Sequence, residues 1–148
     1  MSLEERIENE FKAALKGRDK IKVSTLRMLK ADIINTKLDQ NKKTLKDEEI
    51  VKIIQRQIKQ HKDSIEQFEK GKRQDLAEKE KKELDILLSY MPEQMSEEEL
   101  KKIINDTIKE LEAKSKSDMG KVMKSVMERV KGKADGKKVS QIVSSILG

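Results

Sequence analysis

Apolar residues recur three and four positions apart along nearly the whole chain, and no stretch alternates apolar and polar residues as a surface strand does. Spacing of this kind places side chains on one side of a helix. The pattern predicts an all-α protein, with about four helices in an N-terminal domain and three in a small C-terminal domain. The predicted apolar stripes lie within residues 3–15, 23–34, 50–68, 76–91, 100–111, 119–130 and 139–147.

The second predicted helix also has an apolar face. It consists of Val23, Leu26, Leu29 and Ile33, which follow helical spacing and should face a core. Met28 and Ile34 are further candidates for the same apolar face.

The third predicted helix is unusually long. It starts near Thr44 and reaches Gly71, roughly 25 residues, which exceeds what a small globular domain usually needs. The fourth predicted helix follows it directly. We therefore expect residues 44–91 to form an extended helical hairpin, whose surface could hold a partner protein or a second copy of the chain.

Side chains that can cap a helix start stand just before several stripes. Ser2 and Ser96 each precede a glutamate by three residues, which is the spacing of a capping box. Asp19 and Asp135 are further candidate N-caps. Thr44, three residues before an aspartate, predicts a capped start for the long third helix.

Pro92 is the single proline of the chain, and it predicts a boundary. Proline disfavours helical geometry at the residue before it and cannot donate a backbone hydrogen bond, so the fourth helix should end at Met91. We expect two domains, residues 1–91 and 92–148. The predicted hinge consists of Tyr90, Met91 and Pro92.

The C-terminal tail is the most basic part of the chain. Residues 118–148 hold seven basic and three acidic residues, a net charge of +4 out of +6 for the whole chain. Such a surface attracts anionic partners, and nucleic acid is the commonest of them, although lysines can also simply keep helices soluble. The residues predicted to contact nucleic acid are Lys121, Lys124, Arg129, Lys131, Lys133, Lys137 and Lys138. Because the tail has no aromatic residue to stack on bases, we expect contacts to the phosphate backbone of a folded RNA.

Two segments of this tail resemble a known family. Residues 118–124 and 132–137 are similar to the tail signature of the GatB/YqeY family. Residues 88–100 resemble the family's hinge pattern Leu-x-x-Tyr-Leu-Pro-x-Gln-Leu-Ser, with Met91 and Met95 in place of leucine, a change that conserves size and apolarity. The resemblance covers nearly the whole chain and is to the stand-alone YqeY type.

The resemblance implies a function. A similar domain closes the B subunit of the glutamine-dependent tRNA amidotransferase, where it is implicated in contacting tRNA. The chain is therefore expected to be a tRNA-binding or amidotransferase-related accessory protein, in a family associated with carbon–nitrogen ligase activity that uses glutamine as amido donor. The catalytic body of that subunit is missing, so we expect no activity of the chain alone. The alternative is a helical protein–protein adaptor with a basic, solubilising surface.

Few residues could support chemistry. Cysteine is absent, which excludes disulfides and thiolate metal sites. The only histidine, His61, lies on the apolar stripe of the third helix, and without a second histidine it is interpreted as a packing residue. The acidic runs 47–49 and 97–99 stand at helix starts, where negative charge favourably meets the helix dipole. We expect no catalytic site, no metal and no cofactor.

The location follows from two absences. The N-terminus is charged from Glu4 onwards, unlike a secretory signal, and no apolar run approaches the ~18 residues of a membrane span. We expect a cytoplasmic protein with no membrane partner.

Overall fold

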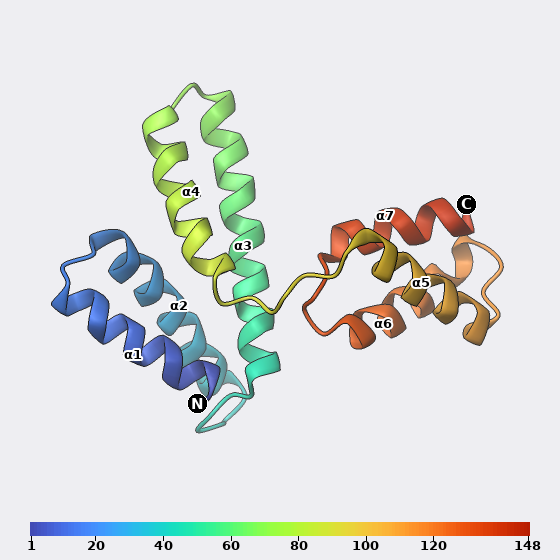
Figure 1. Ribbon diagram of the computed structural model, residues 1–148, viewed down its shortest axis with the longest axis horizontal. Helices are drawn as coiled ribbons and strands as arrows, with labels where there is room; N and C mark the ends of the chain where they lie inside the picture. The colour runs from blue at the N-terminus through green and yellow to red at the C-terminus, as the bar shows by residue number, and fades with distance from the viewer. The chain divides into compact units, whose positions relative to one another are not determined.

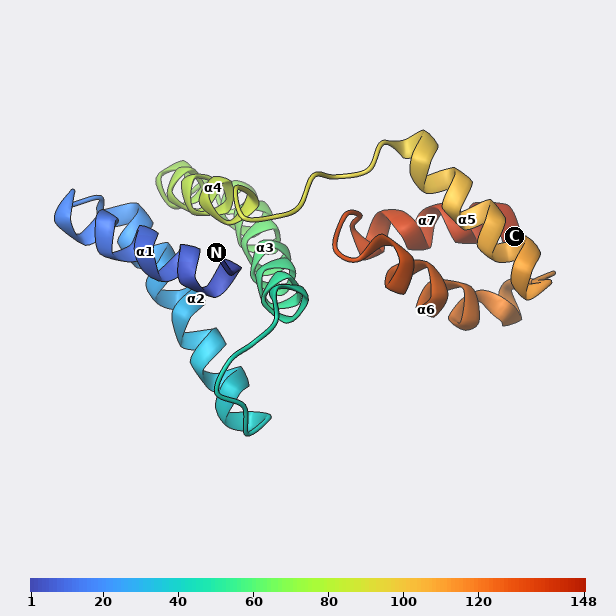
Figure 2. The same ribbon diagram turned by 60° about the horizontal axis from the view of Figure 1, so that its bottom comes forward.

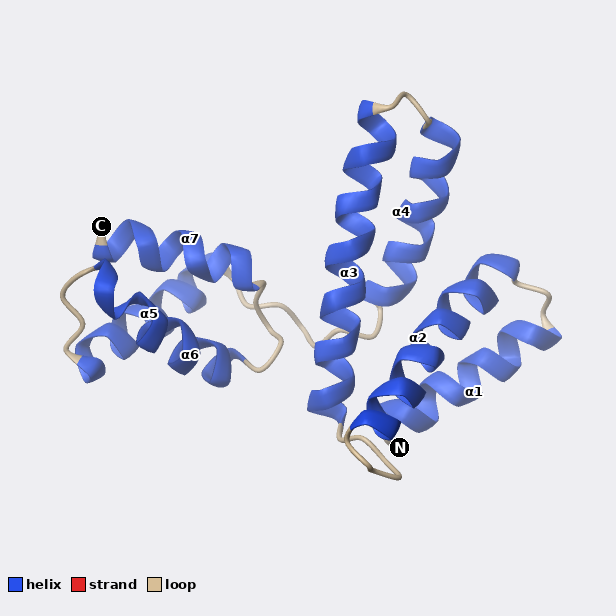
Figure 3. Ribbon diagram, turned by 180° about the vertical axis from the view of Figure 1, so that it is seen from behind, coloured by secondary structure: helices blue, strands red, loops and turns tan.

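The computed structural model describes all 148 residues and contains helices and loops but no strand, which confirms the all-α prediction (Figures 1 and 3). None of its helices combines the length and apolarity needed to cross a lipid bilayer. The elements are α1 (Leu3–Lys16), α2 (Lys20–Asp39), α3 (Asp47–Lys70), α4 (Gln74–Leu88), α5 (Glu97–Leu111), the short 3₁₀ turn η1 (Lys116–Asp118), α6 (Met119–Val130) and α7 (Gly136–Leu147).

The chain separates into two compact units, Met1–Met91 and Pro92–Gly148. Each unit has its own apolar core. The core of the first unit is built by Ile7, Leu26, Leu29, Ile33, Leu45, Ile50, Ile53, Ile54, Ile58, Leu87 and Tyr90. That the two units behave as independent domains stays a prediction.

In the first unit, α3 and α4 pair as an antiparallel hairpin of 24 and 15 residues (Figures 1 and 2). The core of the unit reaches along α3 as far as Ile58. Beyond that residue the two helices continue past α1 and α2, and they pack mainly on each other. Ala77 is fully buried in this outer half of the hairpin, where its small side chain lets the two backbones come close.

Four of the predicted caps are present. Ser2, Asp19, Ser96 and Asp135 each accept a backbone N–H from the first turn of the following helix, at 3.0–3.2 Å. These bonds satisfy donors that have no partner inside the helix.

The cap predicted at Thr44 is wrong, because α3 starts only at Asp47. The carboxylate of Glu49 accepts the backbone N–H of Lys46 at 3.2 Å. The carboxylate of Asp47 instead accepts the N–H of Leu3 at 2.9 Å, and so ties the start of α1 to the start of α3. A contact between residues this far apart in the chain cannot be read from local spacing.

The second unit packs α5, α6 and α7 around valines that are spaced three and four residues apart. Val122, Val126 and Val130 of α6 are fully buried, and so are Val139 and Val143 of α7. α6 ends where the chain enters the left-handed region, with φ of 44° at Lys131 and 82° at Gly132. Gly132 is buried at this reversal, so a glycine is required there.

Candidate functional site

The seven basic residues predicted to bind nucleic acid are all exposed. Lys131, Lys133, Lys137 and Lys138 gather around the turn between α6 and α7. Lys121 and Lys124 lie further back along α6, on the order of 10 Å or more from Lys131 at 1.5 Å per residue. Four of the seven therefore flank one turn, and Lys121 and Lys124 lie apart from it.

The guanidinium of Arg129 forms an ion pair with Glu110 of α5. The first turn of α7 holds no acidic side chain, and only the N-cap Asp135 balances the positive end of the helix dipole. The assignment of the seven residues to nucleic acid stays a prediction.

Tyr90, a predicted hinge residue, is part of the first unit's core and is 4% exposed. Its hydroxyl donates to Glu10 at 3.0 Å, and the Arg6 guanidinium lies 4.7 Å from its ring centre. Burial and the hydrogen bond to Glu10 raise the pKa of Tyr90 well above its ordinary value.

After the proline, the connecting segment is fixed to the second unit. The backbone N–H of Met95 donates to the carbonyl of Lys133 at 2.8 Å, and the Gln94 amide donates to the carbonyl of Gly132 at 3.2 Å. The two ends of the connection are therefore fastened to different units. Whether residues 90–92 act as a hinge stays a prediction.

The apolar residues of α2 occupy two sides of the helix. Leu26, Leu29 and Ile33 are buried, as the spacing predicts. The prediction that Met28 and Ile34 share this face is wrong, since they are 52% and 53% exposed. Each residue turns the helix by about 100°, so Ile34 points well away from its buried neighbour Ile33.

The exposed side of α2 has a regular apolar stripe. Ala31, Ile34 and Leu38 are separated by three and four residues, all three are exposed, and Leu38 is 73% exposed. We call these three residues the α2 stripe. An apolar stripe at helical spacing normally faces a core, and this one has none within its own unit.

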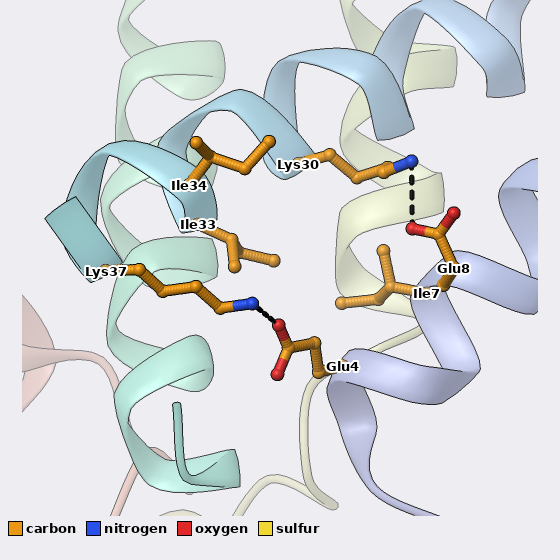
Figure 4. A pocket seen from close by; sticks show the side chains of 7 residues that line it. All are labelled: Glu4, Ile7, Glu8, Lys30, Ile33, Ile34 and Lys37. Carbon is orange, nitrogen blue, oxygen red and sulfur yellow. Dashed lines mark ion pairs between the residues drawn. The ribbon is translucent and has the colours of Figure 1, made fainter. Parts of the chain in front are cut away.

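A small pocket of about 190 Å³ lies beside the α2 stripe, between α1 and α2 (Figure 4). Ile7 and Ile33 point toward each other between two ion pairs, Glu4 with Lys37 and Glu8 with Lys30. The second of these measures 2.8 Å. Ile34 borders the pocket and also belongs to the stripe. The pocket is smaller than most small-molecule sites, and it suits a single apolar side chain.

A comparison with known families identifies the family of this chain. A family model described as Yqey-like protein matches residues 4–147. The chain belongs to the YqeY-like family.

Three relatives of this YqeY-like chain are named altered inheritance of mitochondria protein 41, mitochondrial. That of Pyrenophora tritici-repentis is 34% identical over 97% of this chain and 80% of the relative. That of Kluyveromyces lactis is 34% identical over 57% of this chain and 45% of the relative. That of Candida glabrata is 30% identical over 72% of this chain and 60% of the relative, so the chain spans only part of the latter two.

These relatives correct two predictions. The predicted role as a tRNA-binding or tRNA-amidotransferase accessory protein is wrong, because the relatives are named for the inheritance of mitochondria and not for amide transfer. The predicted cytoplasmic location is also wrong, because the names place the relatives in mitochondria.

Two side chains of the YqeY-like protein that face His61 were not predicted from the sequence. Glu80 and Glu83 of α4 approach its imidazole. Glu80 lies three residues after Ala77, and Glu83 lies four residues before Leu87. Helical spacing therefore places both on the apolar side of α4, and this is the signal that could have indicated their contact with α3.

Proposed function

We propose that this YqeY-like protein works as a binding protein, and that it holds an amphipathic helix of a partner protein along α2. The observation that supports this most directly is the α2 stripe. α2 already buries Leu26, Leu29 and Ile33 in its own unit, and it still presents Ile34 and Leu38 to solvent. Apolar residues on two sides are typical of a helix that packs against other elements on both sides.

The energy available is sufficient for a specific contact. Fully burying an isoleucine or leucine side chain contributes about 1.5–3 kcal/mol. Ile34 is about half exposed and Leu38 about three-quarters exposed, so together they could supply roughly 2–4 kcal/mol. The adjoining pocket over Ile7 and Ile33 offers a place for one anchoring side chain of the partner.

The surroundings of the α2 stripe suit a helical partner. Apolar side chains at intervals of three and four residues are how a helix is recognised by a complementary helix. The ion pairs of Glu4 with Lys37 and Glu8 with Lys30 border the pocket, and they provide the polar rim common to protein interfaces.

The hairpin is the weaker candidate for this role. Of its large apolar side chains only Leu88, at its base, is exposed, whereas α2 exposes three. The outer half of the hairpin is covered by charged and polar residues, which gives a partner little apolar surface. We therefore assign partner binding to α2 rather than to residues 44–91.

The test combines cross-linking with measured binding. A photoreactive amino acid replaces Leu38 in one variant and Gln60, exposed on α3, in another. We expect a cross-linked protein specific to position 38. After purification, that protein should bind the wild-type chain, and an Ile34→Asp/Leu38→Asp variant should bind at least about tenfold more weakly, as the loss of 1.4 kcal/mol or more implies.

The matched control is a Gln60→Asp/Gln67→Asp variant, which changes the charge equally at exposed positions of α3 and should bind as wild type. Equal cross-linking at positions 38 and 60, or equal affinity of both double variants, would contradict the role of α2. If sedimentation shows that two copies of the chain pair through α2, the stripe mediates self-association and the proposed partner protein is refuted.

A further inference from the structure

Three ionisable side chains meet in the outer half of the hairpin. His61 of α3 places Nε2 3.1 Å from a carboxylate oxygen of Glu83 and 3.4 Å from one of Glu80, both on α4. The side chains of His61 and Glu83 are each 7% exposed, and that of Glu80 is 24% exposed. All the potential ligand atoms lie within 4.8 Å of one another.

The contact of the other ring nitrogen, Nδ1, shows which nitrogen of the imidazole carries the proton. Nδ1 of His61 lies 2.8 Å from the backbone carbonyl of Gln57, which can only accept a hydrogen bond. Nδ1 therefore carries the proton and donates it. In a neutral ring the lone pair of Nε2 then faces the oxygens of Glu80 and Glu83, so nothing donates between the ring and the two carboxylates.

The negative charge of the two carboxylates is not balanced by neighbouring positive charge. No lysine or arginine forms an ion pair with Glu80 or Glu83, and His61 is their one basic partner. Even a doubly protonated imidazole would leave one negative charge in excess on the buried Glu83 and the partly buried Glu80. Buried charges without compensation are costly, and a divalent cation bound to a neutral imidazole would balance both carboxylates.

We propose that His61, Glu80 and Glu83 form a divalent-cation site, of the kind that binds Zn²⁺, joining α3 to α4. Ligands about 2.0–2.1 Å from a tetrahedral zinc ion lie roughly 3.3 Å apart, which agrees with the observed 3.1 and 3.4 Å. The bond from Nδ1 to the Gln57 carbonyl is the outer contact that typically orients a zinc-bound histidine.

The nature of the ligands selects the ion. An imidazole with two carboxylates suits Zn²⁺ and neighbouring transition metals, whereas Mg²⁺ and Ca²⁺ prefer oxygen alone. Three protein ligands leave a fourth position for water on the partly exposed side of Glu80. Because the cluster lies beyond the core that ends at Ile58, the ion would join α3 to α4 in a part of the hairpin that this core does not reach.

The test uses the whole 148-residue chain after treatment with a chelator. Isothermal titration with Zn²⁺ should show one equivalent bound, and Co²⁺ should give the visible absorption bands of a tetrahedral site. Hydrogen exchange should slow in residues 59–83 when Zn²⁺ is added, and it should not change in the second unit.

Two variants separate this site from the alternatives. His61→Arg keeps a positive charge between Glu80 and Glu83 but cannot bind a metal, so it should fold and lose at least about a hundredfold in Zn²⁺ affinity. Glu83→Gln should lose a similar factor. If the wild type binds no Zn²⁺, or if it binds no better than His61→Arg, the cluster is an ion pair of an imidazolium with two carboxylates and the metal site is refuted.

Discussion

At the scale of single residues, Glu10 is the polar centre of the first unit. Its carboxylate accepts hydrogen bonds from Arg6 at 2.7 Å, from Tyr90 at 3.0 Å and from Lys22 at 3.3 Å. One side chain of α1 thereby contacts α2 and Tyr90, which lies two residues after the end of α4. Burial alone would raise the pKa of Glu10, but the hydrogen bonds from these three residues outweigh it and hold that pKa below the usual 4.5.

Replacing this carboxylate should therefore make the free energy of unfolding less dependent on pH in the acidic range. A lowered pKa in the folded state contributes stability that is present above pH 4.5 and is lost as the pH falls through the folded-state pKa. Because Glu10 is partly exposed, we expect Glu10→Gln to lower the free energy of unfolding by only about 1 kcal/mol at pH 7. Urea unfolding at pH 7 and pH 3 measures the difference, which should be smaller at pH 3.

The control is Glu93→Gln, an exposed glutamate without an ion pair, which should change stability little at either pH. A Glu10→Gln effect of the same size at both pH values would show that the hydrogen bonds act through packing and not through the charge.

His61 shows how far a single residue can be predicted. Its position on the apolar stripe predicts burial, and the residue is indeed buried. The carboxylates of Glu80 and Glu83 reach it only because of the register in which α4 returns along α3. That register is set by the whole hairpin, so no local pattern around residue 61 could reveal it.

At the scale of elements, helix starts were predictable where the cap is local. Ser2, Asp19, Ser96 and Asp135 bond to residues two or three positions further on, and such bonds depend on little else than the sequence. Thr44 is not a cap, because α3 starts three residues later, at Asp47. The carboxylate of Asp47 accepts the N–H of Leu3 from α1, a contact that local spacing does not show.

α7 offers a test of this rule, because it has an N-cap but lysine where a capping box would have glutamate. Lys138 stands three residues after Asp135. A Lys138→Glu change would let the new carboxylate accept the N–H of Asp135 and would place negative charge at the positive end of the helix. We expect the free energy of unfolding to rise by about 0.5–1 kcal/mol, measured by thermal unfolding at low salt.

Lys133→Glu changes the net charge equally but lies outside any helix, so it should give a smaller effect. Equal stabilisation by both variants would attribute the gain to general charge repulsion in the basic tail and not to the capping box.

At the scale of the whole molecule, two separate cores predict two separately stabilised units. Val126 is fully buried in the second core, and Val126→Ala should destabilise that unit by about 1–3 kcal/mol. Hydrogen exchange should then speed up in peptides from residues 92–148 and remain unchanged in residues 1–91.

The reciprocal variant is Ile54→Ala in the first core, which should affect only residues 1–91, by about 2–5 kcal/mol. Faster exchange throughout the chain in either variant would show that the two units unfold together, and it would contradict their independence.

The sequence by itself determined the helical fold, the long hairpin and four of the helix caps, because each depends on spacing within a few turns of one helix. Its family signatures also identified the family. The role inferred from that resemblance, a tRNA-binding or amidotransferase accessory protein, was wrong, and so was the cytoplasmic location inferred from the N-terminus and the lack of a long apolar run. Tertiary structure alone decided that the side of α2 with Ile34 and Leu38 stays uncovered and that Glu80 and Glu83 meet His61. The physical reason is that helical periodicity fixes which residues share a side of a helix, whereas packing between helices fixes what that side contacts.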